Sequence, residues 1–329
     1  MKNNKLVRLF VLLTLLIAST TSVFAWSFDE MRYELEYGIK AKDFDVVSGA
    51  SDRSFREMNA GLTVYPFEES EFSITGNFAK RVWTNSGSRS NNSSPGKSEN
   101  EESISRELTV GNTWIFGKLM LRPELGMRYT NYKYNSRVDK TIEYRLYPKI
   151  TYSFTNKISA YTRGYFGLRD LDRKGTAKRN DDIDGKQKSR MEYGVRYKFN
   201  NKNALSVAFG RDRTEETHRD YEIKINELRL RYHWTPNRKV TVVPHWFIGT
   251  SGSRLIHAAP GTSNHGKSGE VSKSRIGINT NFKATNSITV LAQIHYEWWR
   301  VTTKVPGSRY PNAVPKDNMF YHLGLKHTF

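Results

Sequence analysis

Cysteine is absent from the 329-residue sequence, and long apolar runs are rare in it. Without cysteine the chain has no disulfide framework, no thiolate metal site and no cysteine nucleophile. Apolar residues make up 37% of the chain, and its mean hydropathy is −0.67. So low a value excludes a helical membrane protein. It does not exclude a transmembrane β-barrel, because the polar half of such a protein lies inside it.

The N-terminal segment has the layout of a secretory signal peptide. Basic residues precede an apolar run over residues 9–18, and Val23-Phe24-Ala25 supplies a small-x-small cleavage site. The alternative, a membrane anchor, needs a longer apolar run than this one. We therefore predict a signal peptide over residues 1–25 and an exported mature chain over residues 26–329.

Apolar and polar residues alternate strictly along the mature chain. From Met31 to Ala41 the odd positions are apolar and the even positions are polar or small, and the pattern returns near residues 142–154, 191–199 and 228–234. Period two is typical of a β-strand with one apolar face. A break in phase between Ile225 and Leu228 predicts a β-bulge.

The alternating segments are about a dozen residues long, and we count about fourteen of them. A tilted strand of that length crosses a bilayer, whereas strands of soluble sandwiches are typically about five or six residues. We predict an all-β fold, a transmembrane antiparallel β-barrel of about fourteen strands. A soluble sandwich is the alternative.

The connections between these segments are alternately short and long. Short turns are predicted at residues 66–70, 117–118, 155–157, 200–203, 235–238 and 283–286. Long polar connections are predicted at residues 43–52, 84–102, 135–139, 170–187, 212–220, 250–272 and 302–317. This asymmetry is typical of outer-membrane barrels, which have short periplasmic turns and long extracellular loops. It predicts an even strand number, with both termini on the periplasmic side.

Aromatic residues end the strands that run toward the short turns. The positions are Phe116, Phe154, Phe199, Trp234, Phe282 and Phe329. Such a row predicts an aromatic girdle at a membrane interface. The terminal Phe329, with apolar residues in phase behind it, resembles the signal that directs barrels to the barrel-assembly machinery, although His327 departs from the usual apolar residue.

The chain resembles the OmpG-type monomeric outer-membrane porin family. The similarity is densest over residues 122–161, 192–199 and 275–329. It implies a single-chain, monomeric barrel whose water-filled lumen passes small hydrophilic solutes. The oligogalacturonate-specific porin family is the second resemblance, and its members have fewer strands and a lumen lined by basic residues.

The polar face of the strands predicts the pore lining. We place there Arg32, Arg81, Arg122, Arg128, Arg145, Lys149, Arg163, Arg169, Arg196, Arg229, Arg231, Arg275, Glu124, Glu143, Glu192 and Glu297. A lumen with excess fixed positive charge favours anions, and guanidinium groups suit the carboxylates of acidic oligosaccharides. The alternative is that Arg and Glu pair across strands and only hold the wall together.

Five further basic residues fall in the apolar phase, close to the long connections. They are Lys80, Arg106, Lys133, Arg211 and Arg300. Long basic side chains at the outer rim can reach lipopolysaccharide phosphates, which predicts outer-membrane lipid and lipopolysaccharide as partners. The alternative is that the strands have already ended at these positions.

Motifs of enzymes and metal sites are not visible. The eight histidines lack zinc-motif spacing, and His245 and His295 lie on strands that are not neighbours. Asp170, Asp172, Asp181, Asp182 and Asp184 fall in one predicted loop, where solvated charges are favoured over a protease or calcium site. The basic charge is dispersed rather than clustered, as it would be for nucleic acid. We predict no enzyme, cofactor, metal or nucleic-acid partner, with a barrel enzyme and a plugged adhesive barrel as alternatives.

Overall fold

The computed structural model describes residues 32–46, 52–67, 70–86, 101–134, 137–174, 186–216, 221–256, 267–303 and 316–328. The predicted signal peptide, its cleavage site and Phe329 lie outside these residues. Within the described ranges all regular secondary structure is β-strand. No helix in these ranges is long and apolar enough to cross a membrane.

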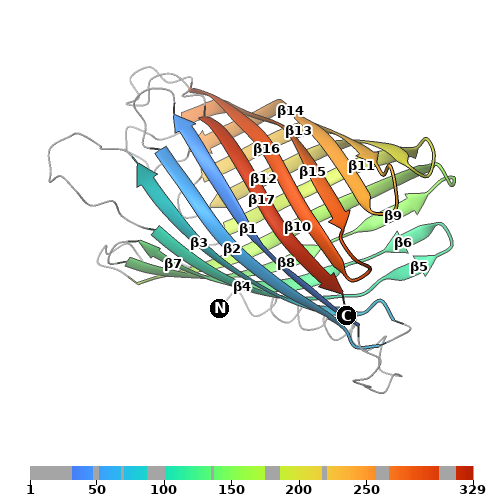
Figure 1. The fold of residues 1–329 in the computed structure, drawn as a ribbon. Coiled ribbons are helices and arrows are strands. Elements are labelled where there is room, and N and C mark those ends of the chain that lie inside the picture. Colours follow the sequence, from blue (N-terminus) through green and yellow to red (C-terminus); the bar gives the residue numbers. More distant parts are fainter. Residues whose placement is uncertain are drawn as a thin grey trace, which may run out of the picture.

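The strands form one antiparallel sheet of 17 strands (Figure 1). Strand β1 pairs with β2 on one side and with β17 on the other, so the series of pairings returns to its first strand. The strands are β1 (Arg32–Val46), β2 (Asp52–Tyr65), β3 (Ser73–Ser86), β4 (Glu101–Gly111), β5 (Trp114–Phe116), β6 (Leu119–Leu121), β7 (Glu124–Tyr134), β8 (Arg137–Tyr147), β9 (Ile150–Ser153), β10 (Ile158–Lys174), β11 (Lys186–Lys198), β12 (Asn203–Glu216), β13 (Tyr221–Trp234), β14 (Val240–Ile256), β15 (Lys267–Lys283), β16 (Ile288–Thr303) and β17 (Lys316–Thr328).

The sheet has more strands than the fourteen expected, because three expected strands are each interrupted by two residues. The interruptions separate β4 from β5, β6 from β7, and β8 from β9. Two of them contain Pro123 and Pro148, and proline has no N–H to donate to a strand ladder. Hydrogen bonds from Asn112 N to Pro123 O (3.4 Å) and from Arg122 N to Lys149 O (2.7 Å) join the three interrupted strands at this level.

The six short turns lie where the sequence predicts them. They join β2 to β3, β5 to β6, β9 to β10, β11 to β12, β13 to β14 and β15 to β16. At the opposite end the strands run further than expected, since β10 continues to Lys174, β14 to Ile256 and β15 begins at Lys267. These ends are mostly polar on both faces, so they carry no period-two signal although the strand pairing continues. The predicted bulge is confirmed by a register shift between Asn226 and Glu227.

The two faces of the sheet differ sharply in polarity. On β8, Glu143 and Arg145 are 1% and 6% exposed, whereas Ile142 and Leu146, which flank them, are 38% and 37% exposed. We call the face that carries Glu143 the interior face and the opposite one the outer face. Exposed apolar side chains cover the outer face of most strands. A soluble sandwich would bury such a face against a second sheet, and the described strands all belong to one sheet.

Aromatic side chains line the outer face at the short-turn end. Phe116, Phe154, Phe199 and Phe282 are all exposed. The rings of Tyr197 and Phe199 pack edge to face with centroids 4.9 Å apart. The predicted row is thus exposed to the surroundings over its described part.

Candidate functional site

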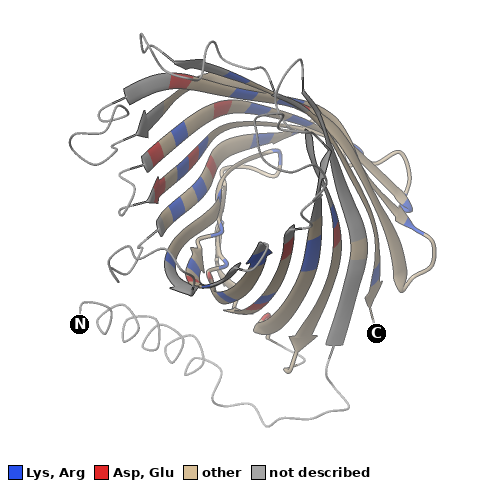
Figure 2. Ribbon diagram, turned by 90° about the vertical axis from the view of Figure 1, so that its left-hand side faces the viewer, with Lys and Arg blue, Asp and Glu red and all other residues tan. Residues whose placement is uncertain are grey.

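Charged side chains of the interior face gather around buried glutamates. Figure 2 shows bands of basic and acidic positions close together on neighbouring strands of the sheet. In the first cluster Glu143 accepts hydrogen bonds from Arg145 Nε (3.0 Å) and Arg169 Nη2 (2.8 Å). Glu107 contacts Arg145 (3.4 Å) and Arg128 (2.6 Å). The cluster therefore connects β4, β7, β8 and β10.

The second cluster surrounds Glu192 on β11. Arg231 binds both oxygens of this carboxylate at 2.7 Å, Arg229 contacts it at 3.0 Å and Arg163 at 2.8 Å. Arg229 and Arg231 come from β13, two strands away. Arg229 crosses the intervening strand β12 over Gly210, which has no side chain, and a Cβ added there would meet the guanidinium of Arg229.

The third cluster surrounds Glu297 on β16. Arg275 Nη2 (2.6 Å), Lys273 Nζ (3.2 Å) and the indole N–H of Trp299 (2.6 Å) all reach its carboxylate. Phe247 of β14 borders this cluster, with the guanidinium carbon of Arg275 5.5 Å from its ring centroid. A cation at that distance from an aromatic face is attracted by the ring.

Two smaller groups also carry interior charges. Arg81 donates from Nε to Glu57 (2.7 Å). Glu124 contacts Arg122 at 3.5 Å and also pairs with Lys149. Together, these five clusters and groups contain every residue predicted to line the pore except Arg32, whose side chain is not among those described, and Arg196, which is exposed on the interior face.

The contacts support the pairing of Arg and Glu across strands that the sequence offered as an alternative. Pairing does not neutralise the wall, however. Around Glu192 the four arginines Arg163, Arg190, Arg229 and Arg231 pair with only three described carboxylates, those of Glu192, Glu227 and Asp212.

One interior carboxylate was assigned to a predicted loop. Asp212 lies within β12, where it contacts Arg190 (3.0 Å) and Arg229 (3.4 Å). The residues that follow Asp212 are polar, so no period-two pattern indicated that the strand continues there. Lys273 and Phe247 were also missed, and their period-two phase with Arg275 and His245 is the only sequence signal that could have placed them.

The sequence predicts that His245 and His295 lie on strands that are not neighbours, which is confirmed, and that they form no facing pair, which is wrong. His245 on β14 and His295 on β16 are two strands apart, yet their ring centroids are 6.1 Å apart. Gly277 of β15 lies between them, and a Cβ there would meet His295. His295 also stacks on Phe320 at 4.4 Å. Among the described residues, no group of three or more His, Asp or Glu side chains could hold a metal ion.

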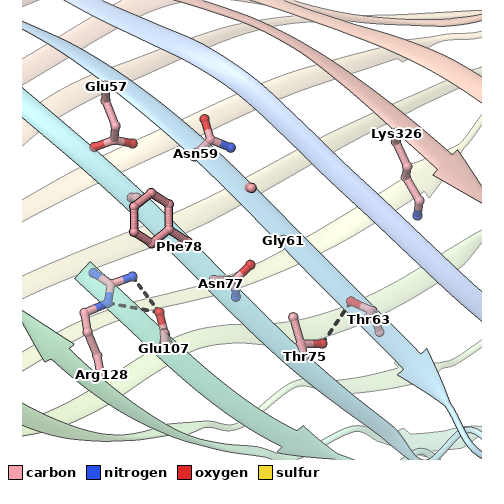
Figure 3. Close-up of a pocket in the computed structure, with 12 residues that line it drawn as sticks. Glu57, Asn59, Gly61, Thr63, Thr75, Asn77, Phe78, Glu107, Arg128 and Lys326 are labelled. Atoms are coloured by element: carbon pink, nitrogen blue, oxygen red, sulfur yellow. Dashed lines mark hydrogen bonds and ion pairs between the residues drawn. The ribbon is translucent and has the colours of Figure 1, made fainter. Parts of the chain in front are cut away.

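Part of the interior face of β2 and β3 carries short uncharged side chains instead of a cluster of charges. Asn59, Gly61 and Thr63 of β2 face Thr75 and Asn77 of β3 around a cavity of about 320 Å³ (Figure 3). We call these five residues the amide wall. The hydroxyls of Thr63 and Thr75 are 3.0 Å apart, and Asn59 Oδ1 has no hydrogen-bond partner within the described part of the chain. Glu57, Glu107, Arg128 and Lys326 border the cavity.

Comparisons with known proteins give similarity in fold only. No family model matches the sequence, and no curated protein matches it. A solved structure titled as a deletion mutant of the monoaromatic hydrocarbon channel TodX has a TM-score of 0.56 at 9% identity, covering 91% of this chain and 90% of that one. The Pseudomonas putida toluene transporter TodX has a TM-score of 0.52 at 9% identity, covering 92% and 90%. At such identities the likeness shows a shared all-β fold alone.

Proposed function

We propose that this protein is an outer-membrane β-barrel channel through which small hydrophilic solutes diffuse passively. The observation that carries the proposal is a single sheet whose pairings return to β1, with charges on its interior face and exposed apolar side chains outside. A soluble protein has the opposite arrangement, with apolar side chains inside and charged ones outside. Charged side chains inside and apolar ones outside suit a barrel wall that separates lipid from a water-filled interior. The predicted signal peptide and the similarity in fold to channels support the same assignment.

The sequence alone is the basis for the proposed orientation of the barrel in the membrane and for the proposed family. We propose that the short turns are periplasmic, the long connections extracellular and the exposed aromatic row an interfacial girdle. Membership of the OmpG-type family, a monomeric state and recognition of Phe329 by the barrel-assembly machinery stay predictions.

The interior charge supports hydrophilic cargo. A passage for hydrocarbons, the cargo in the titles of the similar structures, would need an apolar lining. The described interior instead carries buried ion-pair clusters with more cations than carboxylates around Glu143, Glu192 and Glu297. Fixed positive charge in a narrow passage raises the local concentration of anions. We therefore propose a preference for anions, with acidic oligosaccharides as candidate solutes.

Recording of the ionic current through the refolded protein in a planar bilayer under a salt gradient tests both the proposed channel and its proposed anion preference. We expect steady conductance with a reversal potential biased toward anions, and a smaller bias in 1 M salt, where the Debye length falls to about 3 Å. The variant R231Q should reduce the bias. R213Q, which removes the same charge from the outer face, should leave it unchanged. Absence of conductance would contradict the channel, and a bias toward cations would contradict only the anion preference.

A further inference from the structure

Five exposed basic side chains lie on the outer face of five neighbouring strands. They are Arg56 on β2, Lys80 on β3, Arg106 on β4, Lys133 on β7 and Lys140 on β8. Pairing places β3 between β2 and β4, and β7 between β4 and β8. With about 4.8 Å between strands, the group spans about 20 Å of the surface. We call it the outer basic cluster. Only three of its members belong to the sequence-predicted rim, since Arg211 and Arg300 lie on β12 and β16.

The outer basic cluster lies at a boundary in polarity. On each of its five strands, the outer-face positions between the cation and the short turn are mainly apolar. They include Met58, Leu62, Phe78, Leu108, Met127, Ile142 and Leu146, all exposed. Lys133 is the last residue but one of β7 and Lys140 the fourth of β8, so these two cations lie on the side of the long connections, and Lys80 and Arg106 lie near the middle of their strands. Basic side chains on a lipid-facing surface are tolerated near the headgroups and costly at the bilayer centre. The cluster thus marks the height of a headgroup layer.

The charge of the cluster is mostly unneutralised. Its one described ion pair joins Lys80 to Glu102 at 3.0 Å. No carboxylate among the described residues pairs with Arg56, Arg106, Lys133 or Lys140. A cluster of this kind attracts anions from its surroundings.

The outer face of β12 and β13 provides the contrast. There Arg213 contacts Glu215 (2.8 Å) and Glu222 (2.7 Å), and Lys224 contacts Glu222 (2.9 Å). Arg213 and Lys224 are therefore matched by two carboxylates of the same surface. The positive excess on β2 to β8 is a local property and not a uniform ring.

We propose that the outer basic cluster binds the phosphorylated sugar headgroup of lipopolysaccharide. Arginine forms paired hydrogen bonds with phosphate and lysine adds a compact charge, while the alkyl stems of both can lie along the apolar band below. A surface about 20 Å wide can contact two phosphates of one disaccharide headgroup together. This inference rests on the proposed outer-membrane location, because lipopolysaccharide occupies only the outer leaflet.

Native mass spectrometry of the refolded protein in detergent tests the proposal. The probes are diphosphorylated lipid A, lipid A lacking both phosphates, and phosphatidylglycerol. We expect the diphosphorylated lipid A to bind at least about tenfold more tightly than either other lipid, and the triple variant R106Q/K133Q/K140Q to lose at least about tenfold in its affinity. The matched control R211Q/K224Q/R300Q removes the same charge elsewhere on the outer face and should bind within about twofold of the unaltered protein.

Equal affinity of the unaltered protein for the three lipids would overturn the proposal, as would equal losses in the two triple variants. Heat-dependent gel mobility reports folding. If the cluster variant does not fold, the three single variants replace it, each with an expected loss of about threefold, and unchanged affinity in all three would overturn the proposal. Conductance is recorded separately. A conducting protein without lipid A binding refutes only this inference, and a silent protein that binds lipid A refutes only the proposed channel.

Discussion

The charged clusters of β7 to β16 and the amide wall of β2 and β3 share one interior face, yet they are built in opposite ways. Around Glu192 and Glu297 long side chains from several strands converge on one carboxylate and fill the space beside the sheet. Along the amide wall, short side chains and Gly61 leave a cavity.

The two regions differ in the side-chain contacts that join their strands. Around Glu107 and Glu192 some contacts run between strands two apart, so they connect strands that the backbone ladder does not join directly. In the amide wall the one described side-chain hydrogen bond joins Thr63 to its direct partner Thr75. Rigidity in the first region thus depends on electrostatic contacts, and in the second on the strand pairing itself.

The largest expected effect comes from removing a central carboxylate. E192Q removes the one described carboxylate partner of Arg231 and one of the three partners of the buried Arg229, and should lower the free energy of unfolding by about 3 kcal/mol. Urea titration of the refolded protein in lipid vesicles measures it. The control E222Q, whose partners Arg213 and Lys224 lie on the outer face, should cost less than about 1 kcal/mol. Equal losses in both would remove the distinction between clusters and surface pairs.

The second-largest effect is expected from adding a side chain at Gly210. G210V places a branched side chain where the Arg229 guanidinium lies, and we expect a loss of about 2 kcal/mol in the free energy of unfolding, together with weaker anion bias in bilayer recordings. At Gly76 a Cβ would meet nothing within 4 Å. G76V should therefore keep the anion bias, and a loss of bias there as well would show that the glycine acts through the strand and not through Arg229.

The amide wall should respond more weakly. T75V removes the hydroxyl that lies 3.0 Å from that of Thr63 and should lower the free energy of unfolding by about 1 kcal/mol. T289V alters a threonine with no side-chain hydrogen bond within the described part of the chain and serves as the control. A loss for T75V as large as that for E192Q would mean that the two regions are held equally.

The smallest effect is expected for an exposed ion pair. Arg213 contacts two carboxylates, but its side chain is 43% exposed. Solvent screens such pairs, so R213Q should change the free energy of unfolding by less than about 0.5 kcal/mol. The same urea titrations measure it, and a change above about 1 kcal/mol would show that surface pairing matters here more than is usual.

Much of this arrangement could be predicted from the chain alone. Alternation placed Glu143, Glu192 and Glu297 on one face, and turn residues placed all six short turns. These features depend on local sequence, to which a period-two pattern responds directly.

The rest depends on contacts that the local pattern does not encode. The interruptions at Pro123 and Pro148 raised the strand count above fourteen. The histidine pair forms only because Gly277 of the intervening strand lacks a side chain. Asp212 was hidden because its strand continues past the apolar band. Whether the charged face admits anions is a property of the whole interior field and remains a prediction for the bilayer recordings.

The pairing of β1 with β17 sets a condition on how the molecule is made. Residues such as Gly38 and Gly324 lie opposite each other although almost the whole chain separates them in sequence. Contacts of such high sequence separation form slowly, because the loop they close is long. The first strand cannot find its second neighbour until the last has been synthesised and delivered. Until then the chain has two unpaired strand edges, each able to pair with another molecule. A truncation at either end should thus produce self-association before it produces loss of any single side-chain contact.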